Sequence, residues 1–240
     1  MKAVILAGGK GTRLAPYTKI LPKPLMPIGD MPILEIILRQ MSRAGVDHAV
    51  LTVGHLAKLL ELFFQDGEQL GMRVSYSYED RPLGTAGPLS QVSGLEDSFL
   101  VSNGDVLTTL DLQDLIAYHK EREAVATIAM HHRQVNIDLG VIQLGDDNQV
   151  QDYIEKPTYN YMVSMGIYVF EPLVLDYIPV NRYFDFPDLV KALLQDGKKV
   201  LGYPFSGYWQ DLGRPNDYER AIADFDQMRS QFLHGEEHLE

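Results

Sequence analysis

The chain has 240 residues and a formal net charge of −12, and 45% of its residues are hydrophobic, which is enough for one large buried core. It contains no cysteine, so disulfides, thiolate catalysis and zinc sites built on sulfur are excluded. The negative net charge disfavours a nucleic-acid-binding protein. No apolar run is long enough to span a membrane, and the apolar run at the amino terminus is too short for the core of a signal peptide. We therefore expect a cytoplasmic protein with no nucleic-acid or membrane partner.

The first half of the chain alternates between strand and helix patterns. Buried strands are predicted at residues 2–6, 48–53, 73–78 and 99–102. Helices are predicted at residues 32–44, 56–69 and 85–92, and a further helix begins after Asp111, a favourable N-cap. Strands that alternate with helices predict an α/β fold with a doubly wound, mostly parallel sheet and helices on both faces.

The second half of the chain contains more strands. Apolar or alternating runs between turn residues predict strands at residues 125–130, 140–144, 150–154 and 164–170. A helix is predicted at residues 186–195, and a last helix has Tyr218, Ala221, Ile222 and Phe225 on one face. Because the chain contains neither a repeat nor a flexible linker, we interpret residues 1–240 as one α/β domain with an inserted β-rich region.

The segment from Leu6 to Pro24 carries the clearest functional signal. Three glycines (Gly8, Gly9 and Gly11) follow the first strand, and the first 29 residues contain basic side chains but no acidic one. Backbone N–H groups can approach a ligand closely where there is no Cβ, and cations neutralise phosphate charge, so this pattern predicts a polyphosphate site. The loop is not a Walker P-loop, and it lacks the third glycine of a dinucleotide fingerprint.

Lys23 lies in an unusually restricted backbone. Pro22 and Pro24 flank it directly, and Pro16 and Pro27 stiffen the rest of the segment. A lysine that is merely exposed to solvent at the surface does not need such a restricted backbone. We therefore take Lys23 as a candidate functional residue.

Two aspartates follow apolar strand-like segments. Asp105 ends the run Asn103-Gly104-Asp105 after the strand at 99–102, and Asp211 follows Gly207-Tyr208-Trp209. In an open α/β sheet, ligands bind at the carboxyl ends of strands, so Asp105 is expected beside the glycine-rich loop. Two carboxylates from distant segments could hold one hard cation, although the sequence alone does not pair them. The histidines lack a metal-binding spacing and are interpreted as structural or surface groups.

Taken together, the motifs resemble the signature of the sugar-1-phosphate nucleotidyltransferases, also called nucleoside-diphosphate-sugar pyrophosphorylases. The first motif is G-G-x-G-T-R-L…P-K-P. Five others follow in the family's order and extend the resemblance over residues 2–226: Pro82 to Gly87, Asn103-Gly104-Asp105, Glu155-Lys156-Pro157, Gly166-Ile167-Tyr168 and Tyr208 to Pro215. The resemblance implies a Rossmann-like fold in which residues 1–123 mainly bind nucleotide, residues 124–226 mainly bind sugar phosphate, and residues 227–240 form a tail.

The resemblance also implies roles for individual residues. Catalysis is assigned to Arg13, Lys23, Asp105 and Asp211, and the two aspartates are expected to hold Mg²⁺. Nucleotide binding is assigned to Leu6, Ala7, Gly8, Gly9, Gly11, Thr12, Arg13, Glu79, Pro82, Gly84, Thr85 and Asp105. Sugar-phosphate binding is assigned to Asn103, Gly140, Glu155, Lys156, Gly166 and Trp209. The chemistry fits, because a carboxylate accepts from sugar hydroxyls and an ammonium pairs with a phosphate.

The expected reaction joins an NTP and a sugar 1-phosphate to give an NDP-sugar and pyrophosphate. Residues 79–89 look most like the guanylyltransferase branch, which favours GTP with a mannose-like or other sugar 1-phosphate. Residues 164–218 look more like a bacterial branch that acts on varied surface-polysaccharide sugars, and some relatives use dTTP or UTP with glucose 1-phosphate. The product is therefore expected to serve glycan or surface-polysaccharide synthesis. Ile137 to Gly140 and Ser164 to Gly166 depart from the common family pattern, so the usual hexose is not assumed. The rival interpretations are a non-catalytic nucleotide-sugar-binding paralogue, a glycosyltransferase and a nicotinamide oxidoreductase. A homo-oligomer is possible, but no segment identifies its interface.

Overall fold

A computed structural model describes residues 1–233 of the chain. Its centre is a seven-stranded sheet in the order β12-β8-β11-β6-β1-β4-β5. These strands are β1 (Lys2–Leu6), β4 (His48–Val53), β5 (Arg73–Tyr78), β6 (Phe99–Asn103), β8 (Ala126–Asn136), β11 (Thr158–Phe170) and β12 (Val200–Phe205). Only β11 pairs antiparallel with its neighbours, so the other strands of this sheet end at the same edge. The expected mostly parallel sheet is confirmed.

Five α-helices and three short strand pairs complete the described part of the fold. The helices are α1 (Ile33–Arg43), α2 (Ala57–Phe64), α3 (Leu112–Glu121), α4 (Phe186–Gln195) and α5 (Pro215–Phe232). The short pairs are β2 (Pro27–Ile28) with β3 (Met31–Pro32), β7 (Val106–Thr108) with β13 (Trp209–Asp211), and β9 (Val141–Leu144) with β10 (Val150–Ile154). None of the helices in residues 1–233 is long and apolar enough to cross a membrane.

The sheet has a hydrophobic layer on each face, as strand geometry requires. Side chains alternate along β1, so Ala3 and Ile5 enter one buried cluster and Val4 enters the other. The first cluster takes its helical side chains from α1, α2, α3 and α5, whereas the second takes them from α4. Helices therefore cover both faces, as predicted.

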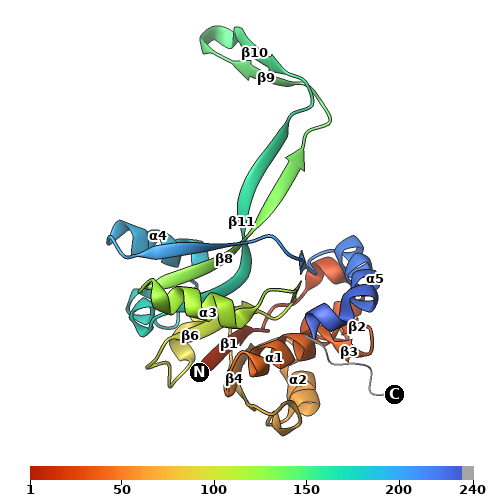
Figure 1. Cartoon of the computed structure of the whole chain (residues 1–240), viewed down its shortest axis with the longest axis vertical. Coiled ribbons are helices and arrows are strands. Elements are labelled where there is room, and N and C mark those ends of the chain that lie inside the picture. Colours follow the sequence, from red (N-terminus) through yellow and green to blue (C-terminus); the bar gives the residue numbers. More distant parts are fainter. Residues whose placement is uncertain (234–240) are drawn as a thin grey trace.

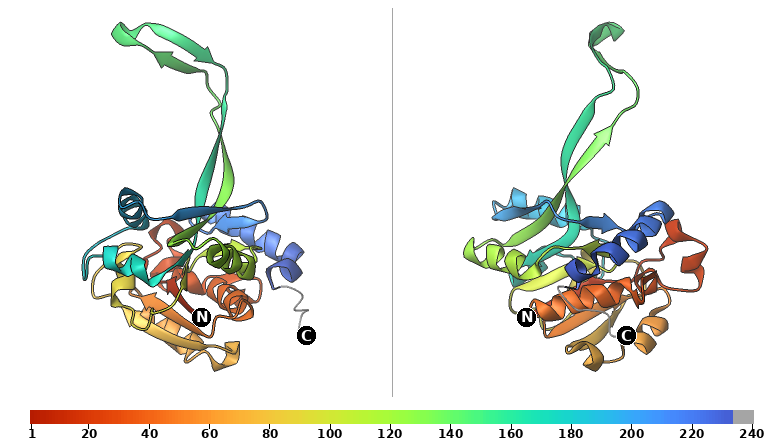
Figure 2. Two further views of the ribbon diagram at one scale, coloured as in Figure 1. Left: turned by 60° about the vertical axis from the view of Figure 1, so that its left-hand side comes forward. Right: turned by 45° about the vertical axis from the view of Figure 1, so that its right-hand side comes forward.

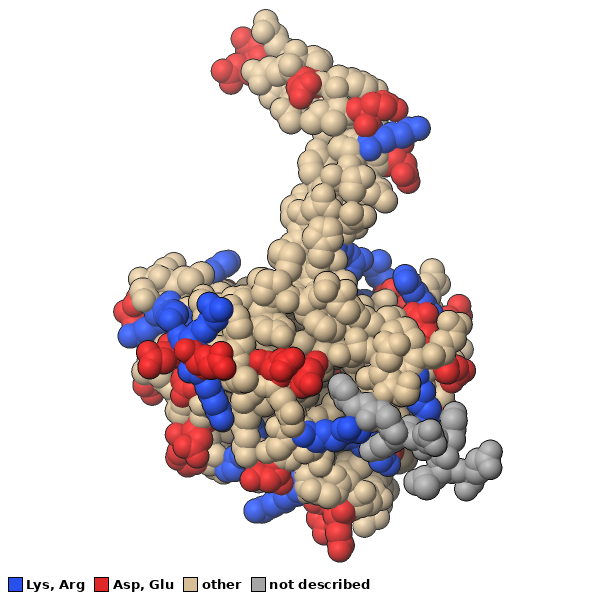
Figure 3. All heavy atoms as spheres, viewed as in Figure 1, with Lys and Arg blue, Asp and Glu red and all other residues tan. Residues whose placement is uncertain are grey.

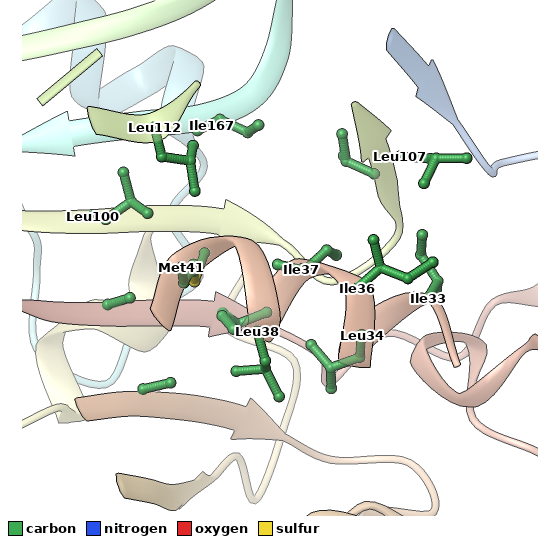
Figure 4. Close-up of a cluster of buried hydrophobic side chains, with 14 of the residues drawn as sticks. Ile33, Leu34, Ile36, Ile37, Leu38, Met41, Leu100, Leu107, Leu112 and Ile167 are labelled. Atoms are coloured by element: carbon green, nitrogen blue, oxygen red, sulfur yellow. The ribbon is translucent and has the colours of Figure 1, made fainter. Parts of the chain in front are cut away.

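Helix α1 anchors the larger cluster. Ile33, Ile36 and Ile37 are fully or almost fully buried, and Figure 4 shows them between the helix and neighbouring strands that include Leu100 and Leu107. The helical spacing of its apolar side chains explains why this segment buries one face. Truncating one of these isoleucines to alanine should cost about 2–5 kcal/mol of unfolding free energy.

Most of the predicted elements lie where the sequence places them. The strands β1, β4, β5 and β10 and the helix α4 have the predicted bounds, and Asp111 caps α3 by accepting from the Gln113 N–H at 2.7 Å. Two helix predictions were wrong in extent. The helix expected at 56–69 ends at Phe64, because Gln65 and Gly67 have positive φ. The helix expected at 85–92 is a 3₁₀ helix over Gly87–Gln91.

The C-terminal boundary of the domain also differs from the expected one. Residues 227–232, expected to belong to a tail, continue α5. The remainder of that tail, residues 234–240, lies outside the described residues.

β8 and β11 continue beyond the sheet as a two-stranded ribbon, which we call the arm (residues 132–162; Figures 1 and 2). The stem of the arm pairs residues 132–136 with residues 158–162, from His132 opposite Met162 to Asn136 opposite Thr158. The tip, residues 137–157, contains β9 and β10. The strands predicted at 125–130 and 164–170 are thus longer than expected, because polar residues continue the ribbon where no core pattern marks it.

Candidate active site

The predicted site lies at the sheet edge where β1, β4, β5 and β6 end. Leu6, the last residue of β1, is in register with Asn103 of β6 and Thr52 of β4. The loop after β1 is held in place by Ala7, whose N–H donates to the Thr52 carbonyl at 2.9 Å. Two adjoining cavities of about 800 and 270 Å³ open here and share Leu6, Gly9 and Asp105 in their walls. The structure therefore brings the glycine-rich loop and Asp105 together.

The smaller cavity is lined by the loop and its flanking residues. Its walls include Ala7, Gly11, Thr12, Arg13 and Lys23. Gly11 has a φ of +59°, and its carbonyl accepts from the Thr18 hydroxyl at 2.8 Å and from the Leu14 N–H at 2.9 Å. A side chain at Gly11 would be strained and would also press on Thr18. The loop therefore lines a cavity of about 270 Å³ next to two cations, Arg13 and Lys23.

Lys23 occupies the centre of the charged group. Its side chain is only 10% exposed, and its ammonium donates to the carboxylate of Asp105 and lies 3.9 Å from Oδ1 of Asp211. Pro22 and Pro24 on either side are buried, so the base of this side chain is fixed. Lys23 is therefore buried, restricted and next to two carboxylates, and its catalytic role stays a prediction.

A strand pair brings Asp105 and Asp211 together. β13 pairs antiparallel with β7, and the Leu212 N–H donates to the Asp105 carbonyl at 3.1 Å. Burial and the neighbouring Asp105 carboxylate raise the pKa of Asp211, against the lowering effect of Lys23 and Arg13. The two carboxylates thus repel each other, and Lys23 and Arg13 offset part of that repulsion. A bound divalent cation would relieve that repulsion.

The donor set fits such a cation, although it does not form a complete protein cage. In residues 1–233, no three His, Cys, Asp or Glu side chains are grouped closely enough to hold a metal by themselves. Asp105 and Asp211 supply two hard oxygen ligands, and the remaining positions would fall to phosphate oxygens and water.

Gly213 is a tightly packed position beside Arg13 and Asp211 that the residue assignments did not include. A Cβ there would lie 3.0 Å from Nη1 of Arg13 and 3.1 Å from Oδ2 of Asp211. The glycine therefore lets a guanidinium and a carboxylate approach the backbone at the same point. Its place two residues after Asp211 in the motif Asp-Leu-Gly-Arg-Pro was the available signal.

The larger cavity has a carboxylate in its wall. Glu79 is partly buried, and burial raises the pKa of this group, against the lowering effect of the Leu83 N–H that donates to Oε2 at 3.1 Å. A Cβ at Gly8 would lie 2.6 Å from Oε1 of Glu79, so only glycine leaves this oxygen room beside the loop. Pro82 and Gly84 also line this cavity. The carboxylate is an acceptor that faces ligand-sized space.

Thr85 lines the same cavity, but its hydroxyl has structural partners. It donates to Oδ1 of Asp185 at 3.0 Å and accepts from the Phe186 N–H at 2.9 Å. The Thr85 N–H also donates to Asp185, at 2.8 Å. Thr85 and Asp185 therefore fasten the wall of the cavity to the start of α4, and Asp185 is a second residue that the assignments missed.

Three of the residues assigned to sugar phosphate lie together beside Asp211. Gly166 has a φ of +77°, and a Cβ there would lie 2.4 Å from Nδ2 of Asn103. The Trp209 indole donates to the Met165 carbonyl at 3.1 Å, and its ring lies 5.5 Å from that of His131 at the base of the arm. A third cavity of about 350 Å³ adjoins this group and contains Arg13, Arg133, Arg214 and Arg220 in its walls.

Gly140, Glu155 and Lys156, the other sugar-phosphate residues, are not in this group. All three belong to the tip of the arm, and Glu155 and Lys156 are exposed, 4.0 Å apart and paired with each other. In the described chain, none of these three residues lines any of the three cavities, whose walls reach the arm only as far as Gln134. Within one copy of the chain, the structure does not bring them to the cleft.

Comparison with known proteins identifies the family of the chain. The family model described as nucleotidyl transferase matches residues 2–228. The chain belongs to the nucleotidyl transferase family. The chain is 36% identical to the mannose-1-phosphate guanylyltransferase of Mycobacterium tuberculosis, over 92% of this chain and 64% of that protein. It is 35% identical to the UTP–glucose-1-phosphate uridylyltransferase of Synechocystis, over 92% of this chain and 62% of that protein.

Solved structures share the fold. A structure described as a glucose-1-phosphate thymidylyltransferase from Bacillus anthracis superposes with a TM-score of 0.77 and 25% identity, covering 98% of this chain and 100% of that one. The chain thus spans a little under two thirds of the length of the two curated relatives, but the whole of this structural relative.

Proposed function

We propose that this nucleotidyl transferase joins an NTP to a sugar 1-phosphate and releases pyrophosphate. The observation that carries the proposal is the cluster of Lys23, Asp105 and Asp211 next to the cavity that the glycine-rich loop lines. A phosphate oxygen of the sugar phosphate attacks the α-phosphorus, and the bond from that phosphorus to the bridging oxygen breaks. Pyrophosphate leaves with the bonding electrons. The attacking oxygen is already an anion, so no general base is required.

The residues of the chain would act by positioning and by charge. The loop from Gly8 to Thr12 would surround the phosphates with backbone N–H groups, and Arg13 would hold the departing pyrophosphate. Lys23 would turn from Asp105 toward the α-phosphate and the sugar phosphate, where negative charge increases during the reaction. Asp105 and Asp211 would hold Mg²⁺, which when bound orients and polarises phosphate oxygens.

Glu79 favours GTP as the nucleotide. An ionised carboxylate only accepts hydrogen bonds, and guanine offers two adjacent donors, N1–H and the 2-amino group, where uracil and thymine offer one N–H. Oε1 of Glu79 lies beside Gly8, and both residues line the larger cavity. A mannose-like sugar is the matching acceptor among the relatives, and UTP or dTTP with glucose 1-phosphate is the second candidate, because a uridylyltransferase is nearly as similar.

A matrix of substrates tests the proposal. GTP, UTP, dTTP and ATP are each crossed with the 1-phosphates of glucose, mannose, N-acetylglucosamine and a heptose in the presence of Mg²⁺. Both pyrophosphate and the NDP-sugar are measured, so that simple NTP hydrolysis is recognised. We expect one strong combination containing GTP, which is lost on chelation of the metal. Nucleotide-sugar binding without turnover in any combination would instead support a non-catalytic paralogue.

A further inference from the structure

The arm is the part of the described chain that the rest of the same fold does not cover, so it is exposed to solvent. No residue from 131 to 164 is buried. Eight of the 17 large hydrophobic side chains that are exposed in residues 1–233 belong to it: Val135, Leu139, Ile142, Leu144, Val150, Tyr153, Tyr161 and Met162. An isolated two-stranded ribbon is marginally stable in water, and grouped exposed apolar side chains mark contact surfaces. The arm therefore needs a partner surface.

The body of the same copy does not provide that surface. In the described part of the chain, every hydrogen bond, ion pair and ring contact of residues 135–162 joins two residues of the arm. The base is fixed, because His131 Nε2 donates to the Gly207 carbonyl at 3.0 Å and its ring lies beside Trp209. The ladder of the stem is continuous from there to Asn136. The arm therefore points away from the cleft above which it begins (Figures 1 and 2).

Charge indicates what the tip would contact. Residues 137–157 contain five acidic residues and one lysine, a formal charge of −4, and Figure 3 shows the acidic side chains gathered there. Residues 10–23 at the mouth of the cleft contain no acidic residue, and three of their four basic residues (Lys10, Arg13 and Lys19) are exposed, whereas Lys23 is buried. Lys10 and Lys19 form no ion pair in residues 1–233, and Tyr17 and Ile20 next to them are 59% and 80% exposed. The two surfaces are complementary in charge and both carry exposed apolar groups.

We propose that two copies of this chain exchange their arms, with the tip of each arm seated on residues 10–23 of the other copy. A twofold arrangement makes the two contacts equivalent and closes the assembly. It would also bring Glu155 and Lys156 of one copy to the sugar-phosphate side of the other copy's cleft, which supplies the residues that one copy lacks. This last consequence rests on the proposed function, whereas the exchange itself does not.

Cross-linking tests the contact without any activity measurement. Because the chain has no native cysteine, only the introduced cysteines can react with the cross-linker. Full-length chains carrying either Asp146→Cys in the tip or Lys19→Cys at the cleft are mixed and treated with a flexible bis-maleimide. We expect a cross-linked dimer from this mixture, but not when Lys58→Cys, on an exposed side chain of α2, replaces Lys19→Cys. Light scattering of the unmodified chain should give the mass of two copies.

Other outcomes would overturn the exchange. A mass of one copy throughout a dilution series would do so. So would a cross-link formed only within a single chain that carries both Asp146→Cys and Lys19→Cys, since the arm would then close over its own cleft. A cross-link between two Asp146→Cys chains would show arm-to-arm pairing instead.

Mixing two inactive variants tests the shared site. Lys23→Met removes a cleft residue, and Lys156→Ala removes an arm residue. In a mixed dimer, the cleft with Lys23 would receive the arm with Lys156. With random pairing, we expect activity to return to about one quarter of the unmodified level. If the unmodified enzyme is active and the dimer forms, but mixing restores nothing, delivery of Lys156 in trans is refuted. If the unmodified chain has no activity, the proposed function fails while cross-linking still decides the exchange.

Discussion

Replacing Lys23 by methionine is the most direct test of the catalytic cluster. Methionine keeps most of the stem's volume but removes the ammonium that contacts Asp105 and lies 3.9 Å from Asp211. The Lys23 side chain is 10% exposed, so solvent screens its charge little. At about 4 Å and an effective dielectric constant of about 20, one pair of unit charges interacts by ~4 kcal/mol. Loss of a single electrostatic contact in an active site costs ~2.7–4 kcal/mol of transition-state stabilisation. We therefore expect turnover to fall by about 10²–10³.

The assay is steady-state release of pyrophosphate with the substrate pair that the matrix identifies. The effect should fall on kcat at least as strongly as on KM, because the contact strengthens as charge develops on the phosphates. Lys2→Met is the matched control. Lys2 lies at the opposite end of β1, where it donates to the Gly94 carbonyl at 2.6 Å, and its loss should leave kcat unchanged. A folded Lys23→Met enzyme with near-normal kcat would refute the mechanism.

Three further predictions concern positions outside this cluster. Glu79→Gln should lower kcat/KM for GTP by about 5–150-fold and bring it closer to kcat/KM for UTP, because one carboxylate acceptor is replaced by an amide N–H₂ donor. If the ratio of the two kcat/KM values does not change, Glu79 does not contact the base. Gly213→Ala should lower turnover while the thermal midpoint changes little, since its Cβ would press on Arg13, and normal turnover would mean that this approach is unimportant. His119 is fully buried between Thr127 and Glu171, and burial lowers its pKa, so the free energy of unfolding should decrease as the pH falls below about 6.5. In urea unfolding, the free energy of unfolding of His119→Gln should decrease less over the same pH range, and an equal decrease would contradict the argument.

The sequence predicted the sheet well where burial has a strong pattern. The runs that became β1, β4 and β5 are apolar and bounded by turn residues, so their positions followed from the pattern alone. The bounds of the 3₁₀ helix at Gly87–Gln91 did not follow from the sequence pattern. The extent of such a short helix depends on the backbone geometry of glycine and proline and on contacts such as that of Thr85 with Asp185.

The candidate site was predictable in part for a similar reason. The loop after β1 and Asp105 belong to neighbouring strand ends, which an α/β pattern implies. The pairing of Asp105 with Asp211 came from the family resemblance, because it depends on the β7–β13 contact between segments without a strong strand signal. The arm could not be foreseen at all. Its residues read as ordinary strands, and whether such strands join the sheet or leave it depends on tertiary packing.

The β7–β13 pairing has a consequence for the time at which the cluster can form. Thr108 and Tyr208 are 100 positions apart in the chain, yet the Thr108 hydroxyl donates to the Tyr208 carbonyl at 2.8 Å. During synthesis from the amino terminus, the glycine-rich loop, Lys23 and Asp105 exist long before Asp211 leaves the ribosome. A nascent or prematurely ended chain can therefore form the triphosphate loop but holds only one of the two carboxylates. Under the proposed mechanism, turnover would therefore begin only after β13 has paired with β7.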